Sequence, residues 1–192
     1  MRTQSAGPMI TPVQGDDADL VRRLRAGDAA AGDQLVARYC PALLRYLRRL
    51  VKNDHIAEEL HQQTWAGVLE HLDRFDVASG AGGFKAWLFR IATNKANDHW
   101  RSQGRERGAR DGMKRVGDEL APDAGYAVEI AEQVDQLTQA IDRLPEHQRQ
   151  ILMLRYYSNL KFVEIAQILG CPLNTALGRM HKAMLRLKQV MS

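Results

Sequence analysis

The chain has 192 residues, of which 45% are hydrophobic and 26% are charged, with 27 basic and 23 acidic side chains. This length allows one domain or two small ones, and the composition excludes a disordered or collagen-like chain. No stretch approaches the roughly 18 consecutive apolar residues of a membrane-spanning helix. Residues 1–15 lack the basic start and apolar run of a secretory signal. The two cysteines, Cys40 and Cys171, are too few for a disulfide framework and favour a reducing, cytoplasmic location.

Charge is divided unevenly along the chain. Residues 101–115 hold six basic and two acidic side chains, residues 116–148 hold eight acids and one base, and residues 174–192 hold four bases and no acid. Each block taken singly is explained by a solvated helix face. Three alternating blocks in a short chain are instead typical of a protein that contacts nucleic acid at separate places.

Helical periodicity predicts an all-α N-terminal domain at residues 16–103, preceded by a disordered extension at residues 1–15. No stretch shows sustained alternation, so no strand is expected. Helices are predicted at residues 16–26, 29–52, 53–73 and 84–101. Pro41 should kink or break the second helix, and the glycine-rich stretch at 75–83 is typical of a flexible loop. The side chains expected to face the core of the third and fourth helices are Ile56, Leu60, Val68, Leu69, Leu72, Phe84, Leu88, Ile91 and Ala92.

A flexible polar linker is expected at residues 104–127, where glycines are frequent and apolar residues are few. Helical periodicity then resumes in a second small domain at residues 128–192. Its later part is predicted as a helix at 145–157, a short helix at 162–169 ended by Gly170, and a last helix opened by Pro172.

The last helix combines an apolar stripe with a basic face. The stripe consists of Leu173, Leu177, Met180, Met184 and Leu187. Arg179, Lys182 and Arg186 are spaced three and four apart, so they project together. A short helix, a glycine turn and a longer basic helix are the parts of a helix-turn-helix, whose second helix lies in the DNA major groove. The alternative is a three-helix scaffold with a solvated basic face.

Motifs for catalysis or cofactor binding are missing from the sequence. The six histidines form no HExxH or close Cys/His set, so no metal site is expected. No phosphate-binding glycine motif is present, and no cofactor is expected. Glu58 and Glu59 are adjacent on a predicted helix and point apart, which does not support paired-acid chemistry. The protein is therefore predicted not to be an enzyme.

Two blocks of sequence resemble the bacterial sigma factors of RNA polymerase. Residues 144–155 (LPEHQRQILMLR) and 164–170 (EIAQILG) are similar to sigma region 4. Residues 84–101 resemble regions 2.3 to 2.4, and residues 57–65 with 72–75 resemble region 2.2. The order and spacing agree over nearly the whole chain. Two such domains joined by a linker indicate the extracytoplasmic-function (ECF) subfamily.

The resemblance implies a set of partners. Glu58, Glu59, Gln62 and Gln63 would bind the clamp helices of the polymerase β′ subunit, and the C-terminal domain would contact the β flap. Promoter DNA and an anti-sigma factor are the other expected partners, with no direct membrane insertion. The acidic linker is similar to the segment that passes through the polymerase in this family.

The resemblance assigns the −10 promoter element to the N-terminal domain. The loop at 76–83 corresponds to the segment that captures a flipped base, against which an aromatic ring can pack. The fourth helix offers amides for base edges and guanidinium groups for phosphates at spacings of four, three and four. Trp87, beside this face, is expected to be mainly a core residue. The residues implied for the −10 element are Phe75, Asp76, Phe84, Arg90, Asn94, Asn97 and Arg101.

The last helix would read the −35 element, with Arg186 and Lys188 more suited to phosphates. The residues implied for this element are Asn174, Thr175, Arg179, Lys182 and Arg186. Here the chain departs from the usual pattern, because Gly178 replaces a serine and the expected lysine is absent. Lys161 also stands where many members have a serine, so the capping box is expected to be lost and Ser158 or Asn159 to substitute for it.

Three functions remain open on the sequence. The first is a promoter-recognition subunit of RNA polymerase without enzymatic activity. The second is a dimeric helix-turn-helix regulator that binds an operator, which leaves residues 57–101 unexplained. The third is a helical enzyme or scaffold with an incidental basic helix.

Overall fold

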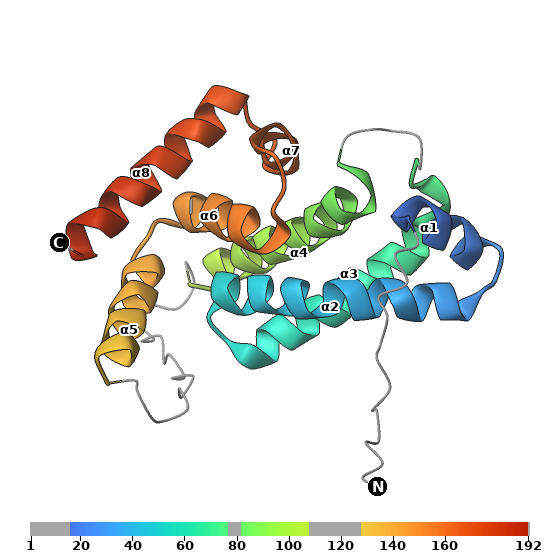
Figure 1. Ribbon diagram of the computed structural model, residues 1–192, viewed down its shortest axis with the longest axis horizontal. Helices are drawn as coiled ribbons and strands as arrows, with labels where there is room; N and C mark the ends of the chain where they lie inside the picture. Colours follow the sequence, from blue (N-terminus) through green and yellow to red (C-terminus); the bar gives the residue numbers. More distant parts are fainter. Residues whose placement is uncertain (1–15, 77–81, 108–127, 192) are drawn as a thin grey trace, which may run out of the picture.

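The computed structural model describes residues 16–76, 82–107 and 128–191, and every regular element in these ranges is a helix (Figure 1). The predicted all-α class is therefore confirmed. The extension at 1–15, the loop residues 77–81 and most of the predicted linker, 108–127, lie outside the described residues. The elements are α1 (Asp17–Arg25), α2 (Ala29–Val51), α3 (Asp54–His71), the 3-10 turn η1 (Leu72–Arg74), α4 (Gly83–Arg107), α5 (Val128–Asp142), α6 (Glu146–Ser158), α7 (Phe162–Ile168) and α8 (Leu173–Met191).

Local capping explains where the first helices begin. The side chains of Asp16, Asp28 and Asn53 accept hydrogen bonds from backbone N–H groups in the first turns of α1, α2 and α3. Pro41 was predicted to kink or break this helix, and a break is wrong, because α2 continues through Pro41. Pro41 and Ala37, whose carbonyl loses its partner, are both exposed, so water can satisfy that carbonyl. The fourth helix also continues past Arg101 to Arg107.

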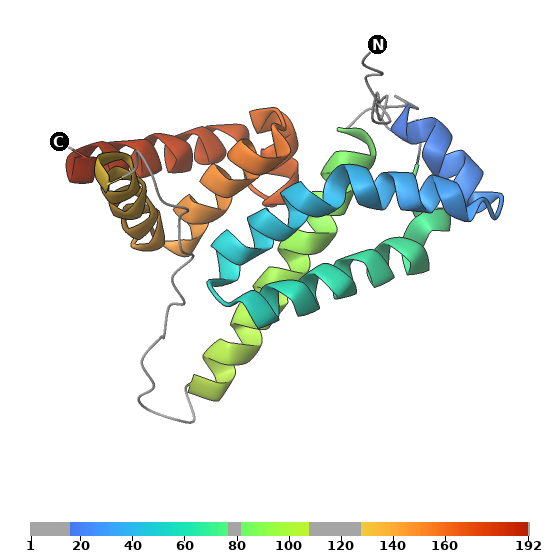
Figure 2. The same cartoon turned by 60° about the horizontal axis from the view of Figure 1, so that its bottom comes forward.

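The N-terminal domain is a bundle of α2, α3 and α4, with α1 across one end (Figures 1 and 2). Tyr46 and Phe89 are fully buried at its centre in an edge-to-face contact, with ring centroids 5.4 Å apart. The Tyr46 hydroxyl and Thr93 Oγ1 are 2.8 Å apart, so the buried polar groups satisfy each other. Most predicted core residues are buried. Leu69 is an exception: it is 65% exposed, because its neighbour Val68 occupies the buried position.

The C-terminal domain contains the predicted helix-turn-helix, formed by α7 and α8 and supported by α5 and α6. Gly170 ends the short helix with φ +59°, a left-handed conformation that glycine adopts without steric cost. The expected substitution by Ser158 or Asn159 at the start of α7 is wrong. Glu164 instead accepts a 2.6 Å hydrogen bond from the Lys161 backbone N–H, so half of the capping box persists.

The buried face of α8 differs from the predicted apolar stripe. Ala176, Ala183 and Leu187 are buried, whereas Leu173, Leu177 and Met184 are exposed. Small alanines allow α8 to approach α6 and α5 closely, so the contact centres on them and the larger side chains flank it. Of the predicted stripe, Leu187 is buried and Met180 is half-buried.

The two domains pack against each other and share one continuous hydrophobic core. Helix α6 lies against α2 and α4, and α7 lies against α4 (Figures 1 and 2). Leu50 of α2 and Ile151 and Leu154 of α6 belong to this shared core, and all three are fully buried.

No helix in the described part of the chain is long and apolar enough to cross a membrane. The described residues also contain no group of three or more histidine, cysteine or acidic side chains suited to a metal ion.

Candidate nucleic-acid and polymerase interfaces

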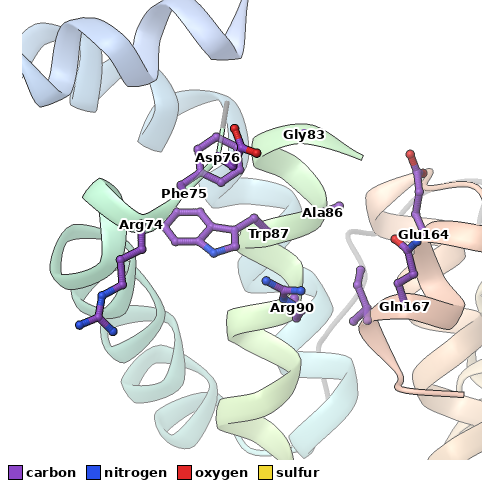
Figure 3. A pocket seen from close by; sticks show the side chains of 10 residues that line it. Arg74, Phe75, Asp76, Gly83, Ala86, Trp87, Arg90, Glu164 and Gln167 are labelled. Carbon is purple, nitrogen blue, oxygen red and sulfur yellow. The ribbon is translucent and has the colours of Figure 1, made fainter. Parts of the chain in front are cut away.

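A pocket lies at the start of α4, where α7 approaches it (Figure 3). We call it the α4–α7 pocket. Asp76 and Gly83, which flank the loop residues outside the described ranges, both line it. The complete lining is Arg74, Phe75, Asp76, Gly83, Ala86, Trp87, Arg90, Glu164, Gln167 and Ile168. The predicted base-capture loop is therefore attached to a concave site.

Of the two aromatic residues predicted beside the loop, Phe75 lines this pocket and Phe84 does not. Phe84 is 1% exposed, so it supports the pocket from behind and does not line it. Phe75 is 8% exposed and packs against Trp87 in a tilted arrangement, with ring centroids 4.9 Å apart. Trp87 was expected to be mainly a core residue. It is half-buried and also lines the pocket. It is therefore the more accessible ring for stacking on a planar base.

The four polar residues predicted on α4 lie along one face, but their surroundings differ. Arg90 and Asn94 are exposed. Arg101 is exposed and pairs with Asp98 on the same helix at 3.0 Å. Asn97 is half-buried, and its Oδ1 accepts a 2.9 Å hydrogen bond from the Gln150 side chain of α6. The structure thus leaves three of the four facing solvent.

The basic face of α8 is present as predicted. Thr175, Lys182 and Arg186 are exposed, and Arg179 is half-buried. The Arg186 guanidinium donates a 2.8 Å hydrogen bond to the side chain of Gln148, which is buried and orients it. Asn174 is also exposed, at the start of the helix, where backbone N–H groups favour anions.

The positive charges of this face affect the ionisation of His147, a residue of α6. Partial burial, followed by the positive charges of Arg179, Arg186 and Lys182, lowers the pKa of the His147 imidazole below its ordinary value. The neutral imidazole is therefore favoured near neutral pH, and the basic face consists of arginine and lysine charges. Such a face is suited to a polyanion.

The predicted polymerase-binding residues share the exposed side of α3. Glu58, Glu59, Gln62 and Gln63 are all exposed, with Gln63 Nε2 3.0 Å from Glu59 Oε1. Leu69, which we predicted to be inward, lies seven residues after Gln62 and so shares its face. An exposed leucine beside acids and amides provides an apolar centre for a protein contact.

Sequence reasoning missed the polar residues that join the domains. Gln148, Arg149 and Gln150 are consecutive in α6, and each is at most 7% exposed. Three polar residues in a row do not follow the apolar periodicity by which buried positions are recognised. Their burial depends on long-range partners: Arg186, the Leu50 carbonyl and Asn97.

Comparisons with known proteins agree with this arrangement. Residues 35–106 match the family model for sigma-70 region 2, and residues 134–187 match that for sigma-70 region 4. The chain is 30% identical over 178 residues to the RNA polymerase sigma-H factor of Pseudomonas aeruginosa, covering 88% of this chain and 91% of that protein. It is 28% identical over 173 residues to the ECF sigma factor SigW of Bacillus subtilis, covering 84% and 89%.

A solved structure shows the same fold. The sigma factor RpoE of Bartonella quintana, in complex with the anti-sigma factor NepR, matches with a TM-score of 0.71 and 26% identity over 83% of this chain and 95% of that one. The two family models cover most of the chain in the expected order, and a relative at 30% identity spans almost its full length. The chain therefore belongs to the ECF subfamily of RNA polymerase sigma factors.

Proposed function

We propose that this sigma factor uses three separate surfaces in promoter-specific initiation. The exposed side of α3 binds the core polymerase, the α4–α7 pocket with the polar face of α4 reads and opens the −10 element, and the basic face of α8 reads the −35 element. The observation that carries the proposal is that Arg90 lines the pocket together with Trp87, and that Asn94 is exposed one turn further along α4. Guanidinium, amide and indole groups together suit the phosphate, edge and face of an unstacked base.

The region assignments follow from the same surfaces. Residues 16–103 form the unit that binds the polymerase and the −10 element, residues 104–127 link the domains, and residues 128–192 form the −35 unit. The β flap is the proposed polymerase contact of the last unit. We propose a cytoplasmic initiation factor with no enzymatic activity of its own, since its role is to position DNA for the polymerase.

Regulation by an anti-sigma factor is part of this proposal. The Bartonella quintana relative was solved in complex with such a partner, and it shares the fold over most of both chains. Exposed apolar side chains on α8, Leu173, Leu177 and Met184, give a protein inhibitor a surface to cover.

Reconstitution with core polymerase tests the function. The purified chain should co-elute with the core, and the resulting holoenzyme should start transcripts at defined positions on genomic fragments. Asn94→Ala should lower initiation at those starts at least tenfold without weakening co-elution, because Asn94 is exposed and makes no core contact in the proposal. Failure to co-elute under mild salt, or footprinting of a palindrome by the free chain, overturns the proposal in favour of another class of protein.

The basic face of α8 should give promoter binding part of its salt dependence. In the holoenzyme, Lys182→Ala combined with Arg186→Ala should flatten the slope of log K against log salt by about 0.9 for each phosphate that is no longer neutralised. Arg45→Ala, on an exposed part of α2, is the matched control and should leave the slope unchanged. Filter binding over a salt series measures this slope. An unchanged slope in the double variant contradicts the assignment of the α8 face to DNA phosphates.

A further inference from the structure

The last residue of α1 is hydrogen-bonded to the backbone beside the α4–α7 pocket. Arg25 donates to the Leu72 carbonyl from Nε at 3.1 Å and from Nη2 at 2.6 Å. Its Nη2 also donates to the Phe75 carbonyl. Leu72 is the first residue of the η1 turn, and Phe75 is the residue that follows the turn. One planar guanidinium therefore binds the backbone on both sides of η1, an arrangement that suits the fixed fork of arginine donors.

The backbone bound by Arg25 carries one wall of the pocket. Arg74, Phe75 and Asp76 are consecutive residues, and all three line the pocket together with Trp87 of α4 (Figure 3). The Phe75 ring packs against Trp87, as described above, and makes an edge-to-face contact with buried Phe84 at 5.9 Å between centroids. The position of this stretch of backbone therefore determines where the wall stands relative to the Trp87 ring.

The chain changes direction between the two carbonyl groups that Arg25 binds. The Leu72 carbonyl accepts the 3.1 Å hydrogen bond from the Phe75 N–H that closes η1, and Arg25 binds the same oxygen. Phe75 itself is extended, with φ −69° and ψ 118°, so the backbone leaves the helical path there. Carbonyl groups at a helix end lack partners within the helix. By supplying donors at this point, Arg25 fixes the direction in which the backbone continues to Asp76.

Helix α1 is itself held in place, so Arg25 acts from a fixed position. Leu20 and Val21 of α1 are fully buried in the hydrophobic core. At the start of the helix, Asp17 accepts a hydrogen bond from the Tyr39 hydroxyl of α2. Figures 1 and 2 show α1 across the end of the bundle where α3 ends and α4 begins. A residue that supports a binding site must be immobile to keep the site in a defined geometry.

We propose that Arg25 is a positioning residue for base capture in the α4–α7 pocket. It acts through the backbone of Leu72 and Phe75, which it holds so that the pocket receives an unstacked −10 base beside Trp87. The inference rests on the proposed role of this pocket and adds a residue of α1, a helix that the proposed function leaves without a part. A shift of about 1 Å in a supporting residue is enough to loosen a binding site.

Removing single bases from the DNA measures capture directly. The holoenzyme is titrated with a fluorescein-labelled fork-junction DNA from a mapped promoter, in which the non-template strand of the −10 element is single-stranded. Copies of this DNA each carry an abasic site at one −10 position. Loss of the captured base should weaken binding by the wild-type holoenzyme about fivefold or more, as expected for one stacked base. We call this ratio the abasic penalty. Trp87→Ala should abolish it, which assigns the captured base to the pocket.

Arg25→Ala should reduce the abasic penalty to about twofold or less, because the displaced wall no longer holds the base against Trp87. Arg22→Ala is the matched control. Arg22 is an exposed arginine three residues earlier on α1, and its Nε donates to the Ala18 carbonyl of its own helix. This variant removes the same charge and should keep the full penalty. Intact and abasic DNA are titrated with the same preparation, so a smaller folded fraction affects both equally and cancels in the ratio.

Arg25→Lys separates positioning from a direct contact with a DNA phosphate. Lysine keeps the positive charge and lacks the planar fork that reaches both carbonyl groups. Positioning predicts a penalty in Arg25→Lys of no more than half the wild-type value. A phosphate contact contributes equally to intact and abasic DNA, so its loss would weaken both and leave the penalty unchanged.

The outcomes separate this inference from the proposed function. If Arg25→Ala or Arg25→Lys keeps the full penalty while Trp87→Ala loses it, the positioning role is refuted and base capture by the pocket stands. Loss of the penalty in Arg22→Ala as well would attribute the effect to charge and also refute positioning. If no abasic site weakens the wild type, or Trp87→Ala keeps the penalty, the proposed role of the pocket fails, and the role of Arg25 fails with it.

Discussion

Replacing Phe89 with alanine should lower the free energy of unfolding by about 3–5 kcal/mol. The ring is fully buried and packs edge-to-face on Tyr46, so truncation removes apolar burial and leaves a cavity that helices on several sides cannot fill. Domains of this kind are commonly stable by about 5–15 kcal/mol, so the loss is a large part of the total. Urea unfolding followed by circular dichroism at 222 nm measures it.

Leu69→Ala is the matched control for Phe89→Ala, because both truncate a large apolar side chain in the N-terminal domain. Leu69 is 65% exposed, so its truncation should change stability by no more than about 0.5 kcal/mol. A loss of several kcal/mol at Leu69, or none at Phe89, would contradict the register of α3 or α4 in the core.

The helices themselves were predictable because their signals are local. Asn53 and Gly170 act within a turn of their own position, as a side-chain cap and a left-handed end, and Gly170 ends its helix as predicted. The break expected at Pro41 was also a local inference, but it omitted the solvent exposure that lets water replace the lost partner. Exposure of that kind depends on how the helix packs, which the local pattern does not contain.

Which side chain of a helix points into the core was harder to predict where two apolar residues are adjacent. Val68 and Leu69 point about 100° apart on a helix, so periodicity alone leaves open which of them is buried. In α8 the pattern favoured the large side chains, whereas the close approach of neighbouring helices selected Ala176 and Ala183. Larger residues at these two positions would have kept the helices apart.

The residues of the candidate site also fall into two groups, those that the sequence predicted and those that it did not. The exposed polar residues Arg90 and Asn94 followed from spacing on a single helix, since a helical face is a local property. The role of Trp87 in the pocket and the engagement of Asn97 by Gln150 did not, because both depend on where α6 and α7 pack against α4. Periodicity identifies a face of a helix, and the partner of that face comes from tertiary structure.

The exposed leucine on α3 leads to the largest expected effect on partner binding. Glu58, Gln62, Trp65 and Leu69 are spaced four, three and four apart, so they share a face of which Leu69 is the most exposed apolar member. Protein interfaces derive most of their energy from a few apolar or aromatic residues surrounded by polar ones. Leu69→Asp should therefore weaken binding to core polymerase at least about 30-fold, equivalent to about 2 kcal/mol.

Val36→Asp gives the matched control, since Val36 is an exposed apolar residue of α2, 38% exposed, outside this face. Both variants add one negative charge at an exposed position, so the free chains should remain folded and differ only in core binding. Fluorescence anisotropy of labelled chains titrated with core polymerase measures the two affinities. Equal affinity of Leu69→Asp and wild type would place the polymerase contact elsewhere, because a buried and unpaired carboxylate at the centre of an interface cannot be neutral in energy.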